Sequence, residues 1–188
     1  MLTTEQSATL KATILAETDP AFVAARAAGA TGVMAEYFRT PATPAFYVWK
    51  SSVETESIFE AIDWAKLTVV DLASAADSQQ VAAAQTNWHL ACQGKQINLQ
   101  IVLQGRQTIN ATKLKTRQML IDALQNLPSG AGGVLQDAGW TNVKQQLYRA
   151  VNRGERIFAT GTGTTGVPGL ANYEGEISSD DIATAVSN

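Results

Sequence analysis

A glycine-rich loop near the C-terminal end of the chain has the spacing of a dinucleotide-binding fingerprint. The stretch GERIFATGTGTTGVPG contains Gly161-x-Gly163-x-x-Gly166. Such a loop binds a pyrophosphate only between a strand and a helix, because the N-terminus of the helix meets the phosphates. Here the sequence predicts a helix before the loop, and Val167-Pro168-Gly169 follows it without a Gly-Lys-Ser/Thr ending. We therefore expect no phosphate site here and interpret the loop as part of an extended tail.

The other reactive side chains lack the partners that their chemistry needs. His89 and Cys92 have an i, i+3 spacing, but they are the only histidine and the only cysteine, whereas zinc needs three or four protein ligands. The acidic pairs Glu174/Glu176 and Asp180/Asp181 fall in the expected tail. General acid and base catalysis needs carboxylates held rigidly with separated pKa values. The sequence predicts no catalytic residue, no cofactor and no metal site.

The basic residues suggest a binding surface. Arg149, Arg153 and Arg156 are spaced i, i+4 and i+7, so on one helix they form a stripe opposite its apolar residues. Lys113, Lys115 and Arg117 form a second cluster. Two interpretations stay open for the arginine stripe. It is a solvated helix face, or it contacts phosphates or an acidic segment such as the tail of an adjacent copy.

Aromatic and apolar residues supply further candidate contacts. Phe46 and Trp49 belong to an aromatic run that carries a single charge, Lys50. This composition favours core packing or a subunit contact over base stacking, which pairs aromatic with basic residues. In the tail, the candidate partner-binding residues are Val167, Leu170, Tyr173, Glu174, Glu176 and Ile177.

The pattern that must position these residues is mainly α-helical. Thr3 with Gln6 has capping-box spacing, and Asp19-Pro20 is typical of a helix start. Further helices are predicted over residues 32–39, 55–64, 86–104, 111–127 and 141–159, the last two packed together because their link is short. An extended arm is predicted over about residues 41–53. The expected division is a helical body over 1–159 and an extended docking tail over 160–188.

Composition limits the function classes. The net charge of -3 and the pI near 5.1 give no overall attraction to nucleic acid. No stretch approaches the roughly 18 apolar residues that span a bilayer, and the N-terminus lacks the basic start and apolar block of a secretory signal. We expect no contact with a membrane.

Four stretches carry a family resemblance. They are FYVWKSSVETESIFEAIDW, LACQGKQINLQIVLQGRQTINATK, LIDALQNLPSGAGG and RIFATGTGTTGVPGLANYEGEIS. Together they resemble blocks of an uncharacterised family of tailed-bacteriophage structural proteins. The segment Ala73–Gln85 departs from that pattern and is interpreted as an insertion.

The resemblance implies a virion protein made in the host cytoplasm. In size and helical content the chain is similar to head-to-tail adaptors of the phage neck, which form rings of about twelve copies. The implied partners are further copies of the chain, the portal protein and a tail or tail-proximal neck protein, with a non-specific contact to packaged double-stranded DNA. Another virion role, in tail completion or as a minor capsid protein, and a non-virion DNA-binding or packaging factor are the alternatives.

Overall fold

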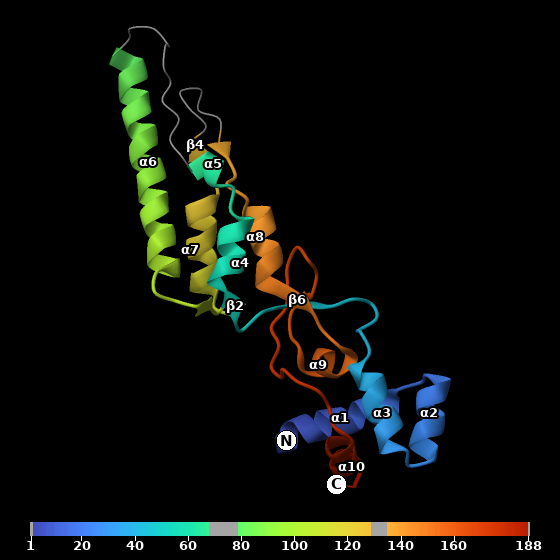
Figure 1. Cartoon of the computed structure of the whole chain (residues 1–188). Helices are drawn as coiled ribbons and strands as arrows, with labels where there is room; N and C mark the ends of the chain where they lie inside the picture. The colour runs from blue at the N-terminus through green and yellow to red at the C-terminus, as the bar shows by residue number, and fades with distance from the viewer. Residues whose placement is uncertain (1, 68–78, 129–134, 188) are drawn as a thin grey trace. The chain divides into compact units, whose positions relative to one another are not determined.

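The computed structural model describes residues 2–67, 79–128 and 135–187, and these residues are mostly helical (Figure 1). The chain divides into two compact units. Unit 1 combines two chain segments, Met1–Trp49 and Tyr148–Asn188, and unit 2 is the continuous segment Lys50–Leu147. The chain therefore leaves unit 1 once, builds unit 2 and returns to complete unit 1.

Unit 1 contains five helices among its described residues: α1 (Thr4–Ala16), α2 (Pro20–Ala27), α3 (Thr31–Arg39), α9 (Arg153–Phe158) and α10 (Ser179–Ser187). Local signals explain several boundaries. Thr3 and Gln6 form the predicted capping box of α1, and the Asp19 side chain accepts hydrogen bonds at the start of α2. The α10 helix packs against both α1 and α3. The C-terminal end of the chain is therefore part of the core of this unit.

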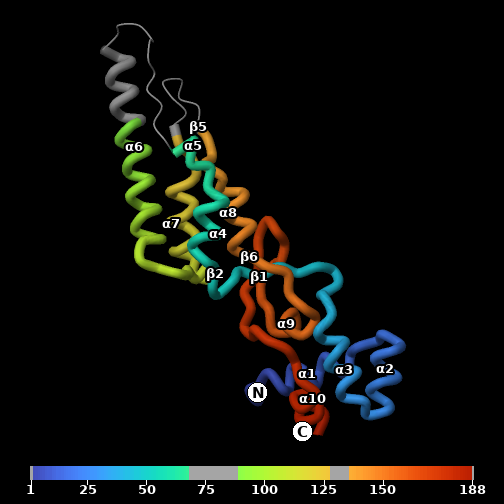
Figure 2. The backbone as a smooth tube through the Cα atoms, in the orientation of Figure 1, coloured from blue at the N-terminus to red at the C-terminus, as the bar shows by residue number. Residues whose placement is uncertain are grey.

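The core of unit 1 joins residues from both chain segments. Its fully or nearly fully buried side chains include Leu10, Ile14, Phe22, Met34, Phe38, Phe158, Ile177 and Ile182. Strand β1 (Tyr47–Trp49) pairs antiparallel with β6 (Tyr148–Ala150), and the two lie side by side in the backbone trace (Figure 2). Isolated bridges join Thr160 to Leu170 and Val48 to Gly169. The glycine-rich loop is thus hydrogen-bonded to the segment that carries β1.

Unit 2 contains α4 (Thr55–Ala61), α5 (Trp64–Leu67), α6 (Gln79–Leu103), α7 (Leu114–Leu124) and α8 (Trp140–Leu147) among its described residues. Its short strands pair as β2 (Val53–Glu54) with β3 (Thr108–Ile109), and β4 (Leu127–Pro128) with β5 (Leu135–Gln136). Helix α6 packs along α7, α4 packs on α8, and α7 contacts α8 (Figure 1). Leu124 and Leu147 are fully buried, so the expected packing of these two helical regions is present.

Two sequence-based expectations are corrected. The single helix predicted over residues 141–159 is instead α8, strand β6 and α9, because residues 148–150 pair with the distant strand β1. The segment 160–188 is not an extended tail, since it forms bridges within unit 1 and ends in α10. The two units accordingly divide the chain at residues 49/50 and 147/148, not at 159/160.

Two other sequence interpretations fall partly or wholly outside the described residues. Within Ala73–Gln85, residues 73–78 lie outside the described part, and residues 79–85 belong to the first turns of α6. The run Gly130–Gly133, whose glycines predict a turn, lies wholly outside it. In the described part of the chain, no helix has the length and apolar character needed to cross a membrane.

Candidate functional site

The three candidate arginines do not form one helical stripe. Arg149 lies on strand β6, whereas Arg153 and Arg156 lie on α9. All three are partly buried, and each makes polar contacts within unit 1. The predicted stripe required one continuous helix over residues 141–159. The structure has strand β6 and helix α9 there, so the three arginines do not share one helix face. What the arginines do follows from their individual contacts.

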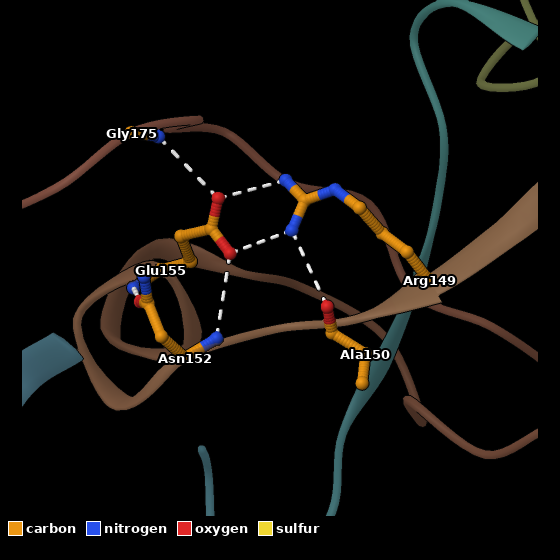
Figure 3. Close-up of polar contacts among 5 residues, drawn as sticks. All are labelled: Arg149, Ala150, Asn152, Glu155 and Gly175. Carbon is orange, nitrogen blue, oxygen red and sulfur yellow. Dashed lines mark hydrogen bonds and ion pairs between the residues drawn. The ribbon is translucent and has the colours of Figure 1, made fainter. Parts of the chain in front are cut away.

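Arg149 forms a bidentate ion pair with Glu155 (Figure 3). Its Nη1 donates to Glu155 Oε2 at 2.6 Å and its Nη2 to Oε1 at 2.7 Å. The Glu155 side chain is only 7% exposed, while that of Arg149 is 31% exposed. The hydrogen bonds to Glu155 raise the pKa of Arg149 above its ordinary value, although burial opposes this. A buried carboxylate is stable only when paired and hydrogen-bonded, and Arg149 supplies that pairing.

Glu155 also organises the backbone around it. It is the third residue of α9, and with Asn152 it forms a capping box in which Glu155 N–H donates to Asn152 Oδ1 at 2.7 Å. Gly175 N–H donates to Glu155 Oε1 at 3.3 Å (Figure 3). One carboxylate therefore joins strand β6, the start of α9 and the segment that precedes α10. The Asn-x-x-Glu spacing of a capping box is a signal that the sequence analysis missed.

Arg153 is held against an aromatic ring. Its guanidinium carbon lies 4.3 Å from the centroid of the Tyr37 ring, and Nη1 donates to the Tyr37 hydroxyl. Burial and a hydrogen bond with Glu17 raise the pKa of Tyr37. Burial alone would raise the pKa of Glu17, but hydrogen bonds from the backbone of Asp19, from Tyr37 and from the backbone of Thr18 outweigh it and lower that pKa. Arg153 thus connects α9 to α3.

The glycine-rich loop encloses an aromatic ring. A Cβ added at Gly163 would lie 2.1 Å from the Phe46 ring, and one added at Gly169 would lie 2.3 Å from the Thr160 carbonyl oxygen. Tyr47 N–H donates to Gly163 O and Gly169 N–H donates to Tyr47 O, both at 2.8 Å. The glycines are therefore needed for close approach to Phe46 and its neighbours. In the described part of the chain, the loop therefore packs on the Phe46 side chain of its own unit.

Arg156 lies on the same aromatic residue. Its guanidinium carbon is 5.5 Å from the Phe46 ring centroid, and its Nη1 donates to the Pro44 carbonyl at 2.6 Å. The other aromatic candidate, Trp49, is 9% exposed and has its ring 6.4 Å from that of Tyr148. These residues join the arm to the returning chain.

The candidate tail residues divide between the core and the surface. Ile177 is 1% exposed, and Tyr173 lies against Phe158 with ring centroids 5.3 Å apart. Glu176 pairs with Arg39 at 3.0 Å within unit 1. Glu174 is exposed, and its charge contributes to the raised pKa of Arg149. Val167 and Leu170 are 61% and 41% exposed, so these two keep an accessible apolar surface.

Two further side chains with reactive groups, Cys92 and Asp181, lie in different units. Cys92 is buried on α6, and the described residues include no group of three or more His, Cys, Asp or Glu that could hold a metal ion. Asp181 and Ser178 cap α10 reciprocally, since Ser178 Oγ accepts from Asp181 N–H at 3.1 Å and Asp181 Oδ2 accepts from Ser178 N–H at 3.1 Å and from the Ser178 hydroxyl at 2.7 Å. Burial alone would raise the pKa of Asp181, but these hydrogen bonds outweigh it and lower that pKa.

A surface in unit 2 was missed by the sequence analysis. A groove of about 770 Å³ is lined by Phe59, Trp64, Gln93, Gln96, Ile97, Leu99, Gln100, Leu103 and Gln104. Leu90, Ile97 and Ile101 on α6 are exposed by 54–60%. The available signal was the near absence of charge on α6, where Lys95 is the single Asp, Glu, Lys or Arg between Gln79 and Leu103.

The chain was compared with protein-family models, curated proteins and solved structures. No protein-family model matches the chain, and comparison with curated proteins and with solved structures gives no match.

Proposed function

We propose that the protein is a structural component of a tailed-phage virion, acting as a ring-forming head-to-tail adaptor that joins the portal to the tail. The observation that carries the proposal is the resemblance of four sequence blocks to the phage structural family. These blocks fall on both units. They include β1 to α4, the second half of α6 with β3, the end of α7, and the end of α9 with most of the glycine-rich loop.

The chemistry of the described side chains agrees with an assembly role. Arg149, Arg153 and Arg156 make contacts inside unit 1, which disfavours the DNA-binding alternative that relied on them. Three exposed apolar side chains, Leu90, Ile97 and Ile101, lie on α6 of unit 2, and in unit 1 Val167 of the glycine-rich loop is 61% exposed. Exposed apolar patches of this kind mark surfaces for other proteins.

The proposed mechanism is assembly into a closed ring. Copies of the chain associate through apolar surfaces, about twelve of them close into a ring, and the ring faces the portal on one side and a tail or neck protein on the other. Val167 and Leu170 would then contact a partner from a loop whose ends are fixed by the bridge between Thr160 and Leu170. This loop replaces the long flexible tail as the docking element, because an ordered loop loses less backbone entropy on binding.

The test is the protein's presence and role in virions. Mass spectrometry of gradient-purified particles should detect it in a fixed ratio to the portal protein, with an early non-structural protein of the same phage as the negative control. Deletion of its gene should leave DNA-filled heads and complete tails that do not join, and a plasmid copy should restore joining. Absence from purified particles would overturn the proposal. Presence in particles whose heads and tails still join would assign it another virion position.

A further inference from the structure

Helix α6 has two apolar faces, and only one of them is covered within the described residues. Cys92, Leu99, Val102 and Leu103 are buried, with exposed fractions of 1–3%. Leu90, Ile97 and Ile101 are exposed by 60%, 54% and 57%. At 3.6 residues per turn, these three lie within about 40° of one another, on the side opposite Cys92 and Leu99. Helices that are apolar on both sides are normally covered on both sides.

The exposed face has the spacing of a helix-pairing seam. Leu90, Gly94, Ile97, Ile101 and Gln104 follow one another at intervals of four, three, four and three residues. This alternation keeps one narrow stripe facing a partner helix in a coiled coil. No other group lies within 4 Å of where a Cβ of Gly94 would be, so the middle of the stripe is open. We call these five residues the α6 seam.

An aromatic pair flanks the α6 seam. Phe59 and Trp64 stack with ring centroids 5.6 Å apart and an interplanar angle of 15°. They remain 41% and 44% exposed, and they line the same groove as Ile97 and Gln104. The Trp64 indole N–H donates to the Phe59 carbonyl at 2.8 Å, which fixes the orientation of the ring. Large aromatic side chains held in one orientation contribute strongly to protein interfaces.

The charge distribution indicates what covers the seam. Lys95 is the single charged residue of α6, and its Nζ donates to the carbonyls of Asp122 and Gln125 at 2.5 and 2.6 Å. Glutamine and asparagine occupy the positions beside the seam, at Gln93, Asn98 and Gln100. Two copies of one surface carry the same charges at the same places, so a charged seam would repel itself, whereas a foreign partner is selected by opposite charges. A neutral seam on a chain of net charge -3 therefore suits a second copy of the chain.

We propose that the α6 seam packs against the α6 seam of a second copy, with Phe59 and Trp64 at the edge of the interface. A surface that pairs with itself closes at two copies, so this contact is separate from the head-to-tail contacts that would close a ring of about twelve, and it does not rest on the proposed function. The association itself is a property of the purified protein. Its test and the virion test therefore have independent outcomes.

The first experiment measures the oligomeric state of the full chain by analytical ultracentrifugation over a range of micromolar concentrations. The wild type should form dimers or larger assemblies. The double variant Ile97→Glu/Ile101→Glu should weaken association by about tenfold or more, with an unchanged circular dichroism spectrum because both side chains are exposed. Val33→Glu is the matched control, since Val33 is 59% exposed in unit 1, and it should associate as the wild type does. A monomeric wild type, or equal effects of the two sets of substitutions, would overturn the proposal.

The second experiment detects the pairing by cross-linking and does not require a substitution that weakens the association. Ile97 is the central residue of the seam, so in a pairing that covers the whole of both seams it faces its own counterpart whether the two helices are parallel or antiparallel. Under mild oxidation Ile97→Cys should form a disulfide-linked dimer, whereas the wild type, whose Cys92 is 1% exposed, and Val33→Cys should not. Failure of Ile97→Cys to cross-link above these controls contradicts the seam pairing, even if the protein associates.

Discussion

At the scale of single residues, Glu155 connects more of unit 1 than any sequence motif indicated. Its carboxylate accepts two hydrogen bonds from Arg149 and one from Gly175 N–H, and its own N–H is capped by Asn152. Replacing Glu155 by Gln leaves the Arg149 guanidinium partly buried without its counter-charge. Because Arg149 keeps 31% of its side chain exposed, we expect a loss of about 3 kcal/mol, the low end for broken buried ion pairs.

Chemical denaturation at pH 7 measures this loss. Glu5→Gln is the control, since it removes the same charge from an exposed residue of unit 1 and should change the free energy of unfolding by about 0.5 kcal/mol or less. Equal stabilities of the two variants would show that the Arg149–Glu155 pair contributes little.

The glycine-rich loop gives a second residue-scale prediction. Gly163 has a φ of 68°, and its Cβ would meet Phe46 at 2.1 Å, whereas a Cβ at Gly166 would meet nothing closer than Thr164 Oγ1 at 3.7 Å. We expect Gly163→Ala to destabilise unit 1 by about 1–3 kcal/mol, and Gly166→Ala to change its stability by about 0.5 kcal/mol or less. Thermal melts of both variants test this. If Gly166→Ala is the more damaging, the loop does not enclose Phe46 as described.

At the scale of elements, the sequence predicted helices well where their signals are local. The capping box of α1 and the Asp19-Pro20 start of α2 are both present, because each depends on residues within one turn. The prediction for residues 141–159 was wrong for the opposite reason. Val143, Leu147, Val151 and Phe158 recur at helical intervals in the sequence and are all buried, but they lie on different elements. The pairing of β6 with β1 depends on a strand about a hundred residues away, which a periodicity cannot show.

The contrast between local and long-range signals also explains which candidate sites the sequence could predict. Arg149, Arg153 and Arg156 were grouped by a helical spacing that the strand interrupts, and their partners Glu155, Tyr37 and Pro44 could not be paired without the fold. The α6 seam was accessible from the sequence, since Leu90, Ile97 and Ile101 share a helical face. Which of the two apolar faces of α6 stays exposed depends on the packing of α7 and the other elements of unit 2.

The cap of α10 makes the stability of unit 1 depend on pH. The folded-state pKa of Asp181 is lowered, so its ionised form stabilises the fold at every pH above the unfolded value of about 4. That contribution is lost as the pH falls through the folded-state pKa. Asp181→Asn should therefore lower the melting temperature by a few degrees above pH 5, as expected for a lost cap.

Below pH 4 the melting temperatures of the wild type and Asp181→Asn should converge. Asp180→Asn is the matched control in the same helical turn, where the side chain is exposed, and it should show a smaller difference at neutral pH. A constant difference between wild type and Asp181→Asn from pH 7 to pH 3 would show that the carboxylate charge is not the stabilising feature.

At the scale of the whole molecule, the two units are completed by different parts of the chain. Unit 1 needs both the first 49 residues and the last 41, whereas unit 2 is continuous from Lys50 to Leu147. Residues 160–188 contribute Ile177 and Ile182 to the core of unit 1, with exposed fractions of 1% and 0%. They also contribute the glycine-rich loop that encloses Phe46. A truncation after Ala159 therefore removes core residues and does not merely shorten a tail.

We expect this truncation to unfold unit 1 and to leave unit 2 folded. Each buried aliphatic side chain that is lost costs about 2–5 kcal/mol, so the loss of Ile177 and Ile182 costs about 4–10 kcal/mol. This is comparable with the roughly 5–15 kcal/mol that stabilises a typical domain, and the packing of α10 on α1 and α3 is lost as well. Limited proteolysis should cut the truncated chain within residues 2–49 and spare residues 79–128 of unit 2. Circular dichroism should show a partial loss of helix. A truncated protein that keeps the protease resistance of its first three helices would contradict the assignment of α10 to the core, and would restore the extended tail as a separate docking segment.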